Sequence, residues 1–452
     1  MVNSGTATLA WDGPVGSIAY RMQDATACLR RLDQPCYVVQ NGHGVGITNA
    51  GRLVPGSLAE DRLRLLHMST PLSGASLGDP AFRQTYGLTA AYMAGSMANG
   101  IASAEMVIAL GRAGMLGSFG AGGVAPHRLE ATIRQVQKAL PDGPYAFNLI
   151  HSPYEPLLEQ RAVELYLTHG VRVVEASAYL SLTPYLVAYR AAGLSEAADG
   201  DVQIRNRVVA KLSRREVASQ FLNPAPEKLL QPLVAQGVIT PVQAALARRV
   251  PMADDITVEA DSGGHTDNRP LVCLLPSIMA LRDEVQAARR YKTPVRVGAG
   301  GGIGTPTAAL GAFMMGAAYV VTGSINQACV EAGTSAHVQK LLATADMADV
   351  MMAPAADMFE MGVNVQVLKR GTMFGLRARR LYELYTTYDG LADIPPADLD
   401  KVERQILQRS VEEVWDACVD FFSERDPSQL EKAQGNPKRK MALVFRWYLG
   451  LA

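Results

Sequence analysis

The glycine-rich stretch VRVGAGGGIGTP, at 295–306, has the residue types of a phosphate-binding turn. Four of the five positions 298–302 are glycine, and Thr305 and Pro306 follow as a helix start. Glycines let the backbone approach a phosphate closely, and the free N–H groups at a helix N-terminus can donate to it. A second small polar turn, Val321-Thr322-Gly323-Ser324, comes with the next predicted strand. Because the loops after strands seven and eight of a barrel often share one phosphate, the two turns predict a phosphate site.

A histidine follows two glycines in the run EADSGGHT, at 259–266. Gly263 and Gly264 would let a flat ring pass close to the backbone, with the imidazole of His265 beside it. This favours a functional role for His265, and the alternative is a loop histidine whose hydrogen bonds are satisfied locally. Glu259 and Asp261 are equally compatible with strand-end or turn residues that bind backbone.

Four other predicted strand ends fill out the same rim. Gly95 follows the first strand, Asn148 lies within an apolar third strand, residues 175–177 end the fourth, and Lys211 lies near the end of the fifth. A buried amide at Asn148 needs a partner, either a ring edge or backbone within the barrel. Lys211 presents a cation that could offset negative charge on a reduced flavin or pair with a carboxylate.

These residues need a scaffold that brings many strand ends together. Short apolar runs alternate with helical patterns eight times between about residue 88 and residue 330, which favours an α/β fold of the TIM-like (β/α)8 barrel type. A doubly wound open sheet uses the same alternation, and eight units favour the barrel. The predicted strands are 88–93, 115–119, 145–150, 171–176, 207–212, 255–259, 295–297 and 319–321.

The pattern changes at both ends of this region. Residues 1–85 are predicted to form a small N-terminal cap, with two short strands around the glycine turn in CYVVQNGHGVGITNAG. The barrel is expected over 86–345, with a helical insertion at about 214–254 where prolines separate helical stretches. Residues 346–452 are expected to form a C-terminal helical region, in which Phe445, Trp447 and Tyr448 serve packing or a dimer interface.

Composition excludes several classes of function. Lys plus Arg and Asp plus Glu each number 43, so no net charge favours nucleic acid or an anionic membrane. The five cysteines form no CxxC pair, which indicates reduced thiols in a cytoplasmic protein. Glycine and proline interrupt the uncharged stretch 297–330, so it is not expected to span a membrane. No zinc motif, GxSxG elbow or P-loop lysine motif is present, and no metal is predicted.

Taken together, the motifs resemble a known superfamily. SGGH after strand six, GAGGGIGT after strand seven, VTGS at strand eight and AGSMANG after strand one are similar to the FMN-dependent nitronate monooxygenases and flavin-type enoyl-acyl-carrier-protein reductases. The segments MGVNVQVLKRGTMFGLRARRLYELYTTYDGL (361–391) and NPKRKMALVFRWYLG (436–450) resemble the PfaD subfamily. PfaD proteins are the trans-acting enoyl reductases of polyunsaturated-fatty-acid synthases and trans-acyltransferase polyketide synthases.

The resemblance implies roles for residues of this chain. FMN would lie at the barrel mouth, with its phosphate on Gly301, Gly302, Gly323 and Ser324. Gly95, Asn148 and Lys211 would surround the isoalloxazine ring, and Gly263 and Gly264 would lie close to it. His265 aligns with the active-site histidine of the family, where it binds the thioester carbonyl or positions the flavin.

The implied reaction is the reduction of a 2-enoyl thioester on an acyl carrier protein, with NADPH as hydride donor. An acidic carrier protein needs a local basic surface, and two clusters are candidates: 369–380 with one lysine and four arginines, and Lys438 to Lys440. A solvated helix face is the alternative for both clusters. An acyltransferase partner and a homodimer are also expected.

Two other functions are weighed against this one. A nitronate monooxygenase would oxidise a small nitronate with dioxygen and would need neither NADPH nor a C-terminal extension. A non-catalytic flavin-binding scaffold would dock carrier proteins without turnover, and the presence of His265 and of both glycine turns speaks against it.

Overall fold

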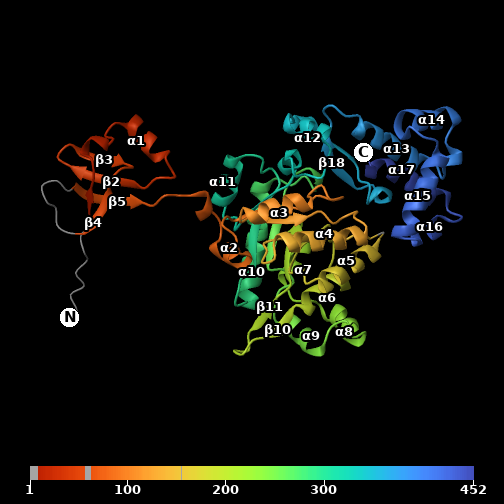
Figure 1. The fold of residues 1–452 in the computed structure, drawn as a ribbon, viewed down its shortest axis with the longest axis horizontal. Coiled ribbons are helices and arrows are strands. Elements are labelled where there is room, and N and C mark those ends of the chain that lie inside the picture. The colour runs from red at the N-terminus through yellow and green to blue at the C-terminus, as the bar shows by residue number, and fades with distance from the viewer. Residues whose placement is uncertain (1–8, 56–62, 154, 452) are drawn as a thin grey trace. The chain divides into compact units, whose positions relative to one another are not determined.

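Eight parallel strands close into a barrel, as the alternation in the sequence predicted. The computed structural model describes residues 9–55, 63–153 and 155–451, and the chain divides into two compact units, Met1–Leu77 and Gly78–Ala452. Figure 1 shows the order of the elements along the chain. The barrel belongs to the second unit, and its strands are β6 (Tyr92–Ala94), β7 (Leu116–Phe119), β8 (Ala146–Ile150), β9 (Val173–Ser177), β12 (Arg207–Leu212), β13 (Asp255–Glu259), β15 (Arg296–Gly300) and β16 (Val320–Thr322).

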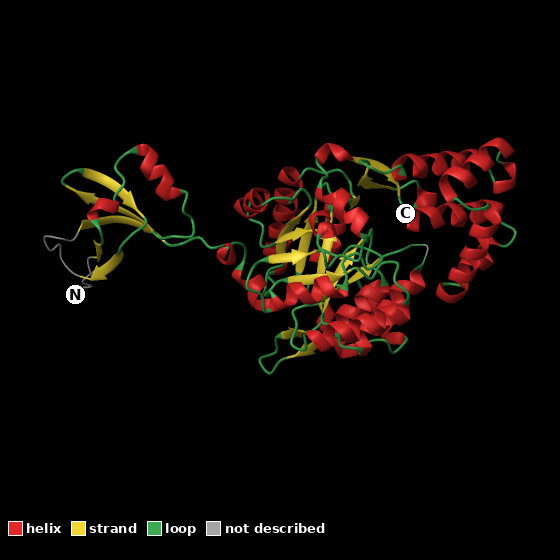
Figure 2. Ribbon diagram, turned by 45° about the horizontal axis from the view of Figure 1, so that its top comes forward, coloured by secondary structure: helices red, strands yellow, loops and turns green. Residues whose placement is uncertain are grey.

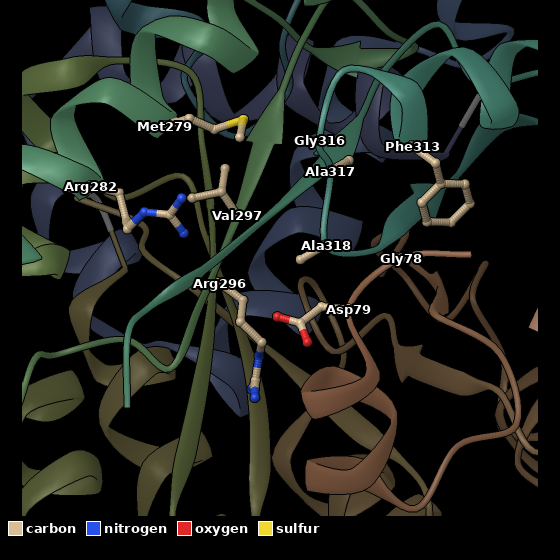
Figure 3. Close-up of a pocket in the computed structure, with 10 residues that line it drawn as sticks. All are labelled: Gly78, Asp79, Met279, Arg282, Arg296, Val297, Phe313, Gly316, Ala317 and Ala318. Carbon is tan, nitrogen blue, oxygen red and sulfur yellow. The ribbon is translucent and has the colours of Figure 1, made fainter. Parts of the chain in front are cut away.

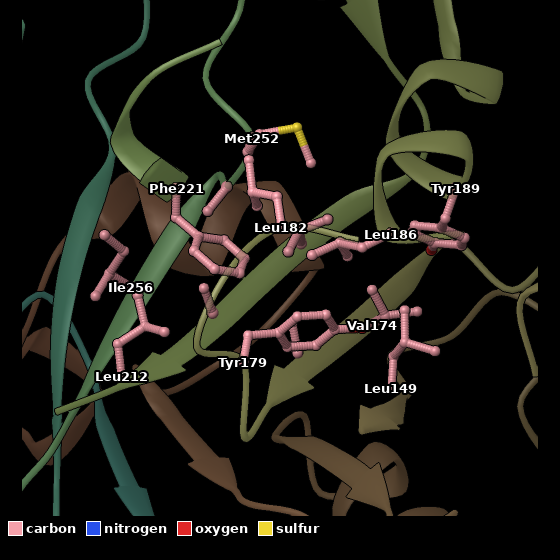
Figure 4. Packing of buried hydrophobic residues seen from close by; sticks show 14 of the residues in the cluster. Leu149, Val174, Tyr179, Leu182, Leu186, Tyr189, Leu212, Phe221, Met252 and Ile256 are labelled. Atoms are coloured by element: carbon pink, nitrogen blue, oxygen red, sulfur yellow. The ribbon is translucent and has the colours of Figure 1, made fainter. Parts of the chain in front are cut away.

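Helices surround the barrel strands in this unit (Figure 2). They cover apolar side chains on the outer faces of the strands, where Leu149, Val174, Leu212 and Ile256 pack against helical residues such as Phe221 (Figure 4). These helices are α3 (Ala104–Arg112), α4 (Pro126–Ala139), α5 (Pro156–Thr168), α6 (Pro184–Ala192), α7 (Arg215–Leu222), α8 (Glu227–Ala235), α9 (Pro241–Ala247), α10 (Leu271–Arg289) and α11 (Pro306–Met314). Helix α12 (Ala336–Ala343) packs instead on the turn η3 (Ser324–Ala328) that follows β16. Helices α7 to α9 occupy the stretch where the sequence indicated a helical insertion. A hairpin of β10 (Leu194–Glu196) and β11 (Val202–Ile204) precedes β12.

Alternate residues of each strand face the barrel interior, because side chains of a strand point to opposite faces in turn. On β9, Val173 belongs to the inner apolar cluster and Val174 to the outer one. Helix α2 (Pro80–Tyr86) closes the barrel at the amino ends of the strands. Its Phe82 stacks on Tyr319 with ring centroids 4.1 Å apart. The interior is therefore sealed at one end, and only the carboxyl ends of the strands remain for a site.

A charged pair completes this closure. The guanidinium of Arg296 donates two hydrogen bonds, of 2.6 and 2.8 Å, to the fully buried carboxylate of Asp255. The hydroxyl of Tyr86, on α2, donates to the same carboxylate at 2.5 Å. Bidentate pairing of this kind satisfies a carboxylate that would otherwise be costly to bury.

The C-terminal part of the second unit begins with strands, which the sequence did not indicate. Strands β17 (Val350–Pro354) and β18 (Asn364–Leu368) pair antiparallel, and β18 also pairs with β14 (Gly264–His265). Helices follow: α13 (Phe374–Thr387), α14 (Pro396–Lys401), the π-helix η7 (Val402–Leu407), α15 (Val411–Arg425), α16 (Ser428–Ala433) and α17 (Pro437–Leu451). Phe445 is buried, and Trp447 and Tyr448 pack, partly buried, against the same apolar cluster, so all three serve packing.

Over its described residues, the first unit is a five-stranded antiparallel sheet with one α-helix, α1 (Met22–Leu29). In sheet order its strands are β3 (Gly44–Thr48), β2 (Cys36–Asn41), β5 (Leu63–Ser69), β1 (Leu9–Asp12) and β4 (Arg52–Pro55). Its core holds Trp11, Ile18, Tyr37 and Val39. The two strands predicted around the glycine turn are β2 and β3, and the sheet is larger than that pair.

The described residues contain neither a membrane-spanning helix nor a cluster of metal ligands. No helix there has the length and apolar character needed to cross a bilayer, and no group of three metal-ligating side chains is found there. All five cysteines lie within the described ranges, and each is a free thiol.

Candidate active site

The predicted site residues gather at the carboxyl ends of the barrel strands. β15 and β16 are neighbours, with Gly300 paired to Val321, so the two glycine turns leave the barrel side by side. β16 in turn pairs with β6, which leads into Gly95, and Gly95 N–H donates to the carbonyl of Thr322 at 2.9 Å. The rim around the phosphate turns is thus continuous in space although its parts are far apart in sequence.

The glycines of the first turn meet a geometric requirement. Gly301 and Gly302 have φ values of +89° and +70°, a region that residues with a side chain rarely adopt. A Cβ on Gly301 would lie 2.5 Å from the carbonyl oxygen of Ala260, whereas one on Gly302 would meet nothing within 4 Å. The turn is therefore tight on the barrel side and open on the other, as a cradle for a phosphate must be.

The second turn meets the histidine loop. A Cβ on Gly263 would lie 2.7 Å from the hydroxyl oxygen of Ser324, so a side chain at Gly263 would require Ser324 to move. Gly264 has φ +86°, and neither Gly264 nor Gly323 has an atom within 4 Å of where a Cβ would be. The turns after β13, β15 and β16 therefore form one glycine-lined surface with open space above it.

The barrel interior just below the mouth is polar. Lys211 and Glu259 form an ion pair, with 2.9 Å between Nζ and Oε1. Burial alone would lower the pKa of Lys211, but the charges of Glu259 and Glu175 outweigh it and raise that pKa, so the ammonium stays charged. Of the two roles predicted for Lys211, the structure shows the pairing with a carboxylate.

Asn148 uses its amide within the barrel. Its Nδ2 donates at 3.0 Å to the carbonyl of Glu175 and to the hydroxyl of Ser177, both on β9. This is the backbone contact that the sequence left open as an alternative to a ring edge. Two side chains of this layer keep unsatisfied buried atoms among the described residues: Oε1 of Glu175 and Oγ of Ser118.

His265 is held by a carboxylate from a distant segment. Its Nε2 lies 3.0 Å from Oδ1 of Asp357, in the connection between β17 and β18. Pairing of β14 with β18 brings the two residues together. Burial would lower the pKa of His265, but the hydrogen bond and charge of Asp357 outweigh it, so the pKa lies above its ordinary value. About a third of each side chain is exposed, at 37% and 34%, which leaves the imidazole accessible.

Comparison with known proteins agrees with this architecture. The sequence model of nitronate monooxygenases matches residues 87–379, and the model of the N-terminal domain of the fatty acid synthase protein PfaD matches residues 11–71. The chain belongs to the PfaD branch of the nitronate monooxygenase family. A third match, to the inserted helical domain of [acyl-carrier-protein] S-malonyltransferase, covers residues 388–452.

Relatives within this branch come from lipid and polyketide biosynthesis. The chain is 50% identical over 445 residues to one of the polyunsaturated fatty acid synthase proteins of a Thraustochytrium species, covering 97% of this chain and 29% of that protein. It is 48% identical over 378 residues to the polyketide biosynthesis protein PksE of Bacillus subtilis, covering 83% of this chain and 49% of PksE. The chain thus spans less than half the length of these relatives.

A solved structure is also similar over most of its length. The crystal structure of the enoyl reductase domain of MlnA, from the macrolactin cluster of Bacillus amyloliquefaciens, superposes with a TM-score of 0.78 at 41% identity. The match covers 84% of this chain and 85% of that domain.

The cavity at the other end of the barrel is separate from this site. It has a volume of about 350 Å³ and is lined by Asp79, Met279, Arg282, Arg296 and Phe313 among others (Figure 3). Arg296 and Val297 begin β15, so the cavity lies at the amino ends of the strands. In barrels of this architecture the active site lies at the opposite face.

The sequence did not reveal Asp357 or Ser118, and it marked Glu175 only as one of the rim residues 175–177, without a role. Asp357 is 92 residues from His265 and meets it only through strand pairing. Glu175 and Ser118 had a usable signal, since each is a polar residue at an inward position of an apolar strand.

Proposed function

We propose that the chain is a trans-acting enoyl reductase that uses NADPH and FMN to reduce the 2,3-double bond of enoyl thioesters on acyl carrier protein, in polyketide or polyunsaturated-fatty-acid biosynthesis. The observation that carries the proposal is the His265–Asp357 pair beside the glycine turns at the barrel mouth. The similarity to the MlnA enoyl reductase domain and to PksE supports the same reaction class.

The residues at the mouth fit FMN. The open turn at Gly302, Gly323 and Ser324 would hold the phosphate, since its glycines leave room for an anion close to backbone N–H groups. Lys211, Asn148 and Gly95 would lie around the ring, and the unsatisfied buried atoms below the mouth call for a polar partner. Bound FMN would supply hydride transfer from NADPH to the β-carbon of the enoyl group.

His265 would stabilise the substrate oxygen. Its raised pKa favours the protonated ring, in which both nitrogens carry hydrogen. One N–H is held by Asp357, and the other can donate to the thioester carbonyl as that oxygen gains enolate charge. Asp357 thus orients the ring and favours its charged form, while the proton for the α-carbon would come from water or from an acid that the sequence does not identify.

An acyl carrier protein would dock near this mouth, and an acyltransferase partner and a homodimer are further proposals. Of the two basic clusters, Lys438 to Lys440 is engaged internally: Lys438 donates to the carbonyl of Tyr388, Arg439 pairs with Glu360, and Lys440 lies over the ring of Trp415. Residues 369–380 also make surface ion pairs, such as Arg370 with Asp349 and Arg380 with Asp398, but four of the five cations there are exposed. This cluster is therefore the docking surface that we favour.

Steady-state turnover tests the reaction class. With crotonyl-acyl carrier protein, we expect NADPH oxidation and formation of the butyryl product in equal amounts, without oxygen uptake. Oxygen uptake with a nitronate and no need for NADPH would replace the proposal with a nitronate monooxygenase. A purified protein that neither retains nor binds FMN would support the non-catalytic scaffold.

A further inference from the structure

Glu175 is a carboxylate with one oxygen in use and one without a partner. It lies on β9 at an inward position and is fully buried. Oε2 accepts a hydrogen bond of 2.7 Å from the backbone N–H of Ser96. Oε1 is buried and accepts none from the described part of the chain. An unsatisfied buried acceptor on a charged group is costly, so this oxygen calls for a donor that the protein itself does not supply.

Oε1 lies at the start of the loop that follows β6. It lies 3.3 Å from where a Cβ on Gly95 would be, so the absence of a side chain at Gly95 keeps that approach clear. Lys211 acts on Glu175 through its charge, but its ammonium is hydrogen-bonded to Glu259 instead. The hydroxyl oxygen of Ser118, on β7, is the other unsatisfied buried atom of this layer. Both atoms are therefore polar groups of the barrel interior that lack a partner among the described residues.

The side chain of Glu175 starts on β9 and ends beside the loop after β6, so its carboxylate lies inside the barrel rather than at one edge of it. In the order β12-β13-β15-β16-β6-β7-β8-β9, β9 and β16 are four strands apart and face each other across the barrel. The phosphate turns follow β15 and β16, so a ligand anchored there presents its other end to β8, β9 and β12. Asn148, Glu175 and Lys211 are polar side chains that these three strands contribute to the interior. The pyrimidine edge is the polar edge of an isoalloxazine, and the oxidised ring carries a single N–H, at N3.

We propose that Glu175 is a cofactor-binding residue whose free oxygen accepts the N3–H of FMN. This inference rests on the proposed function, because it takes FMN as the cofactor. The carboxylate also places a negative charge beside a ring that gains negative charge on reduction, so it weakens the binding of reduced FMN relative to oxidised FMN. Glu175 then contributes both to cofactor recognition and to the reducing power of the bound ring.

Glu175→Gln tests this with binding rather than turnover. The amide can still accept from Ser96 N–H but has no charge, and it cannot offer acceptors to both donors. We expect oxidised FMN to bind more weakly, and the affinity ratio of reduced to oxidised FMN to rise by about tenfold or more. Glu105→Gln, which removes an exposed carboxylate on α3, is the matched control and should leave the ratio unchanged. An unchanged ratio in folded Glu175→Gln would overturn the inference.

A modified cofactor avoids any risk that the variant fails to fold. N3-methyl-FMN lacks the proposed donor, and we expect the wild-type protein to bind it at least about tenfold more weakly than FMN. Equal affinity for the two would contradict a contact at N3. Absence of any FMN binding by the wild-type protein would instead refute the proposed function, so the two failures are distinguishable.

Discussion

The pair of His265 and Asp357 determines the chemistry at the scale of single residues. Since Asp357 raises the pKa of His265, the charged pair stabilises the fold below the ordinary histidine value of 6.5, and this contribution is lost as pH rises through the higher folded-state value. The pKa of Asp357 is lowered, because His265 and Arg446 outweigh the effect of burial. The Asp357 contribution is therefore present above the ordinary value of 3.8 and is lost as pH falls through the lower folded-state value.

Asp357→Asn should lower the pKa of His265. The variant removes the charge that outweighs burial, so the imidazole should lose its proton at lower pH. An NMR titration of the His265 ring measures this directly, and the alkaline limb of the enoyl-reduction rate should move in the same direction. An unchanged titration would mean that Asp357 acts on His265 only as a structural contact.

His265→Ala separates binding from catalysis. We expect FMN to remain bound and enoyl reduction to slow by about 100-fold, because one donor to the developing enolate is lost. Oxidation of NADPH should change less, since it needs no donor to the thioester. Equal losses in both half-reactions, measured by single-turnover kinetics, would count against His265 as the carbonyl ligand.

At this scale the sequence revealed the histidine and missed its partner. His265 could be found because SGGH directly follows a recognisable strand, and loops after barrel strands carry active sites. Asp357 lies in AADMF, where nothing local marks a functional carboxylate. Asp357 reaches His265 only because β14 pairs with β18. Pairing between strands so far apart in the chain leaves no pattern in the sequence.

The turns after β13, β15 and β16 carry the function at the scale of elements. Their strands were predictable, because β-branched runs such as those at β12 and β13 alternate with amphipathic helices. Strands β17 and β18 were not, since VMMAP and NVQVL are five-residue runs that resemble helix ends as much as strands. The larger N-terminal sheet was missed for a similar reason, because its outer strand β4 has only four residues.

Gly301→Ala should weaken FMN binding. A side chain at φ +89° costs about 1–2 kcal/mol, and its Cβ would lie 2.5 Å from a backbone oxygen. The turn must then shift, and we expect the dissociation constant for FMN to rise by about tenfold or more. Gly304→Ala is the matched control, because its Cβ would make only an ordinary contact of 3.8 Å with Ile325. Equal affinity of both variants for FMN would contradict the assigned phosphate turn.

The barrel and the C-terminal helices form one unit at the scale of the whole molecule, and buried charges join them. Arg425, at the end of α15, lies 2.8 Å from Glu155, which precedes α5 of the barrel. Arg446 of α17 lies 3.5 Å from the same carboxylate and 3.4 Å from Glu360. Since Arg446 also acts on Asp357, the C-terminal helices contribute to the electrostatic setting of His265.

Arg425→Ala should destabilise this unit. It leaves the carboxylate of Glu155, only 7% exposed, with the longer contact to Arg446 alone. Removing one partner of a buried ion pair costs about 3–5 kcal/mol, which denaturant unfolding can measure. Arg404→Ala removes an exposed pair with Asp400 and should change stability by less than about 1 kcal/mol. Equal effects of the two variants would mean that the barrel and the helices do not depend on the buried network.

The measurement that tests the central claim most directly is an anaerobic stopped-flow experiment that follows flavin absorbance. The account predicts that NADPH bleaches the flavin and that crotonyl-acyl carrier protein then restores the oxidised spectrum, in two separate phases. A flavin that NADPH leaves oxidised, or one that NADPH reduces and the enoyl thioester does not reoxidise, would contradict it.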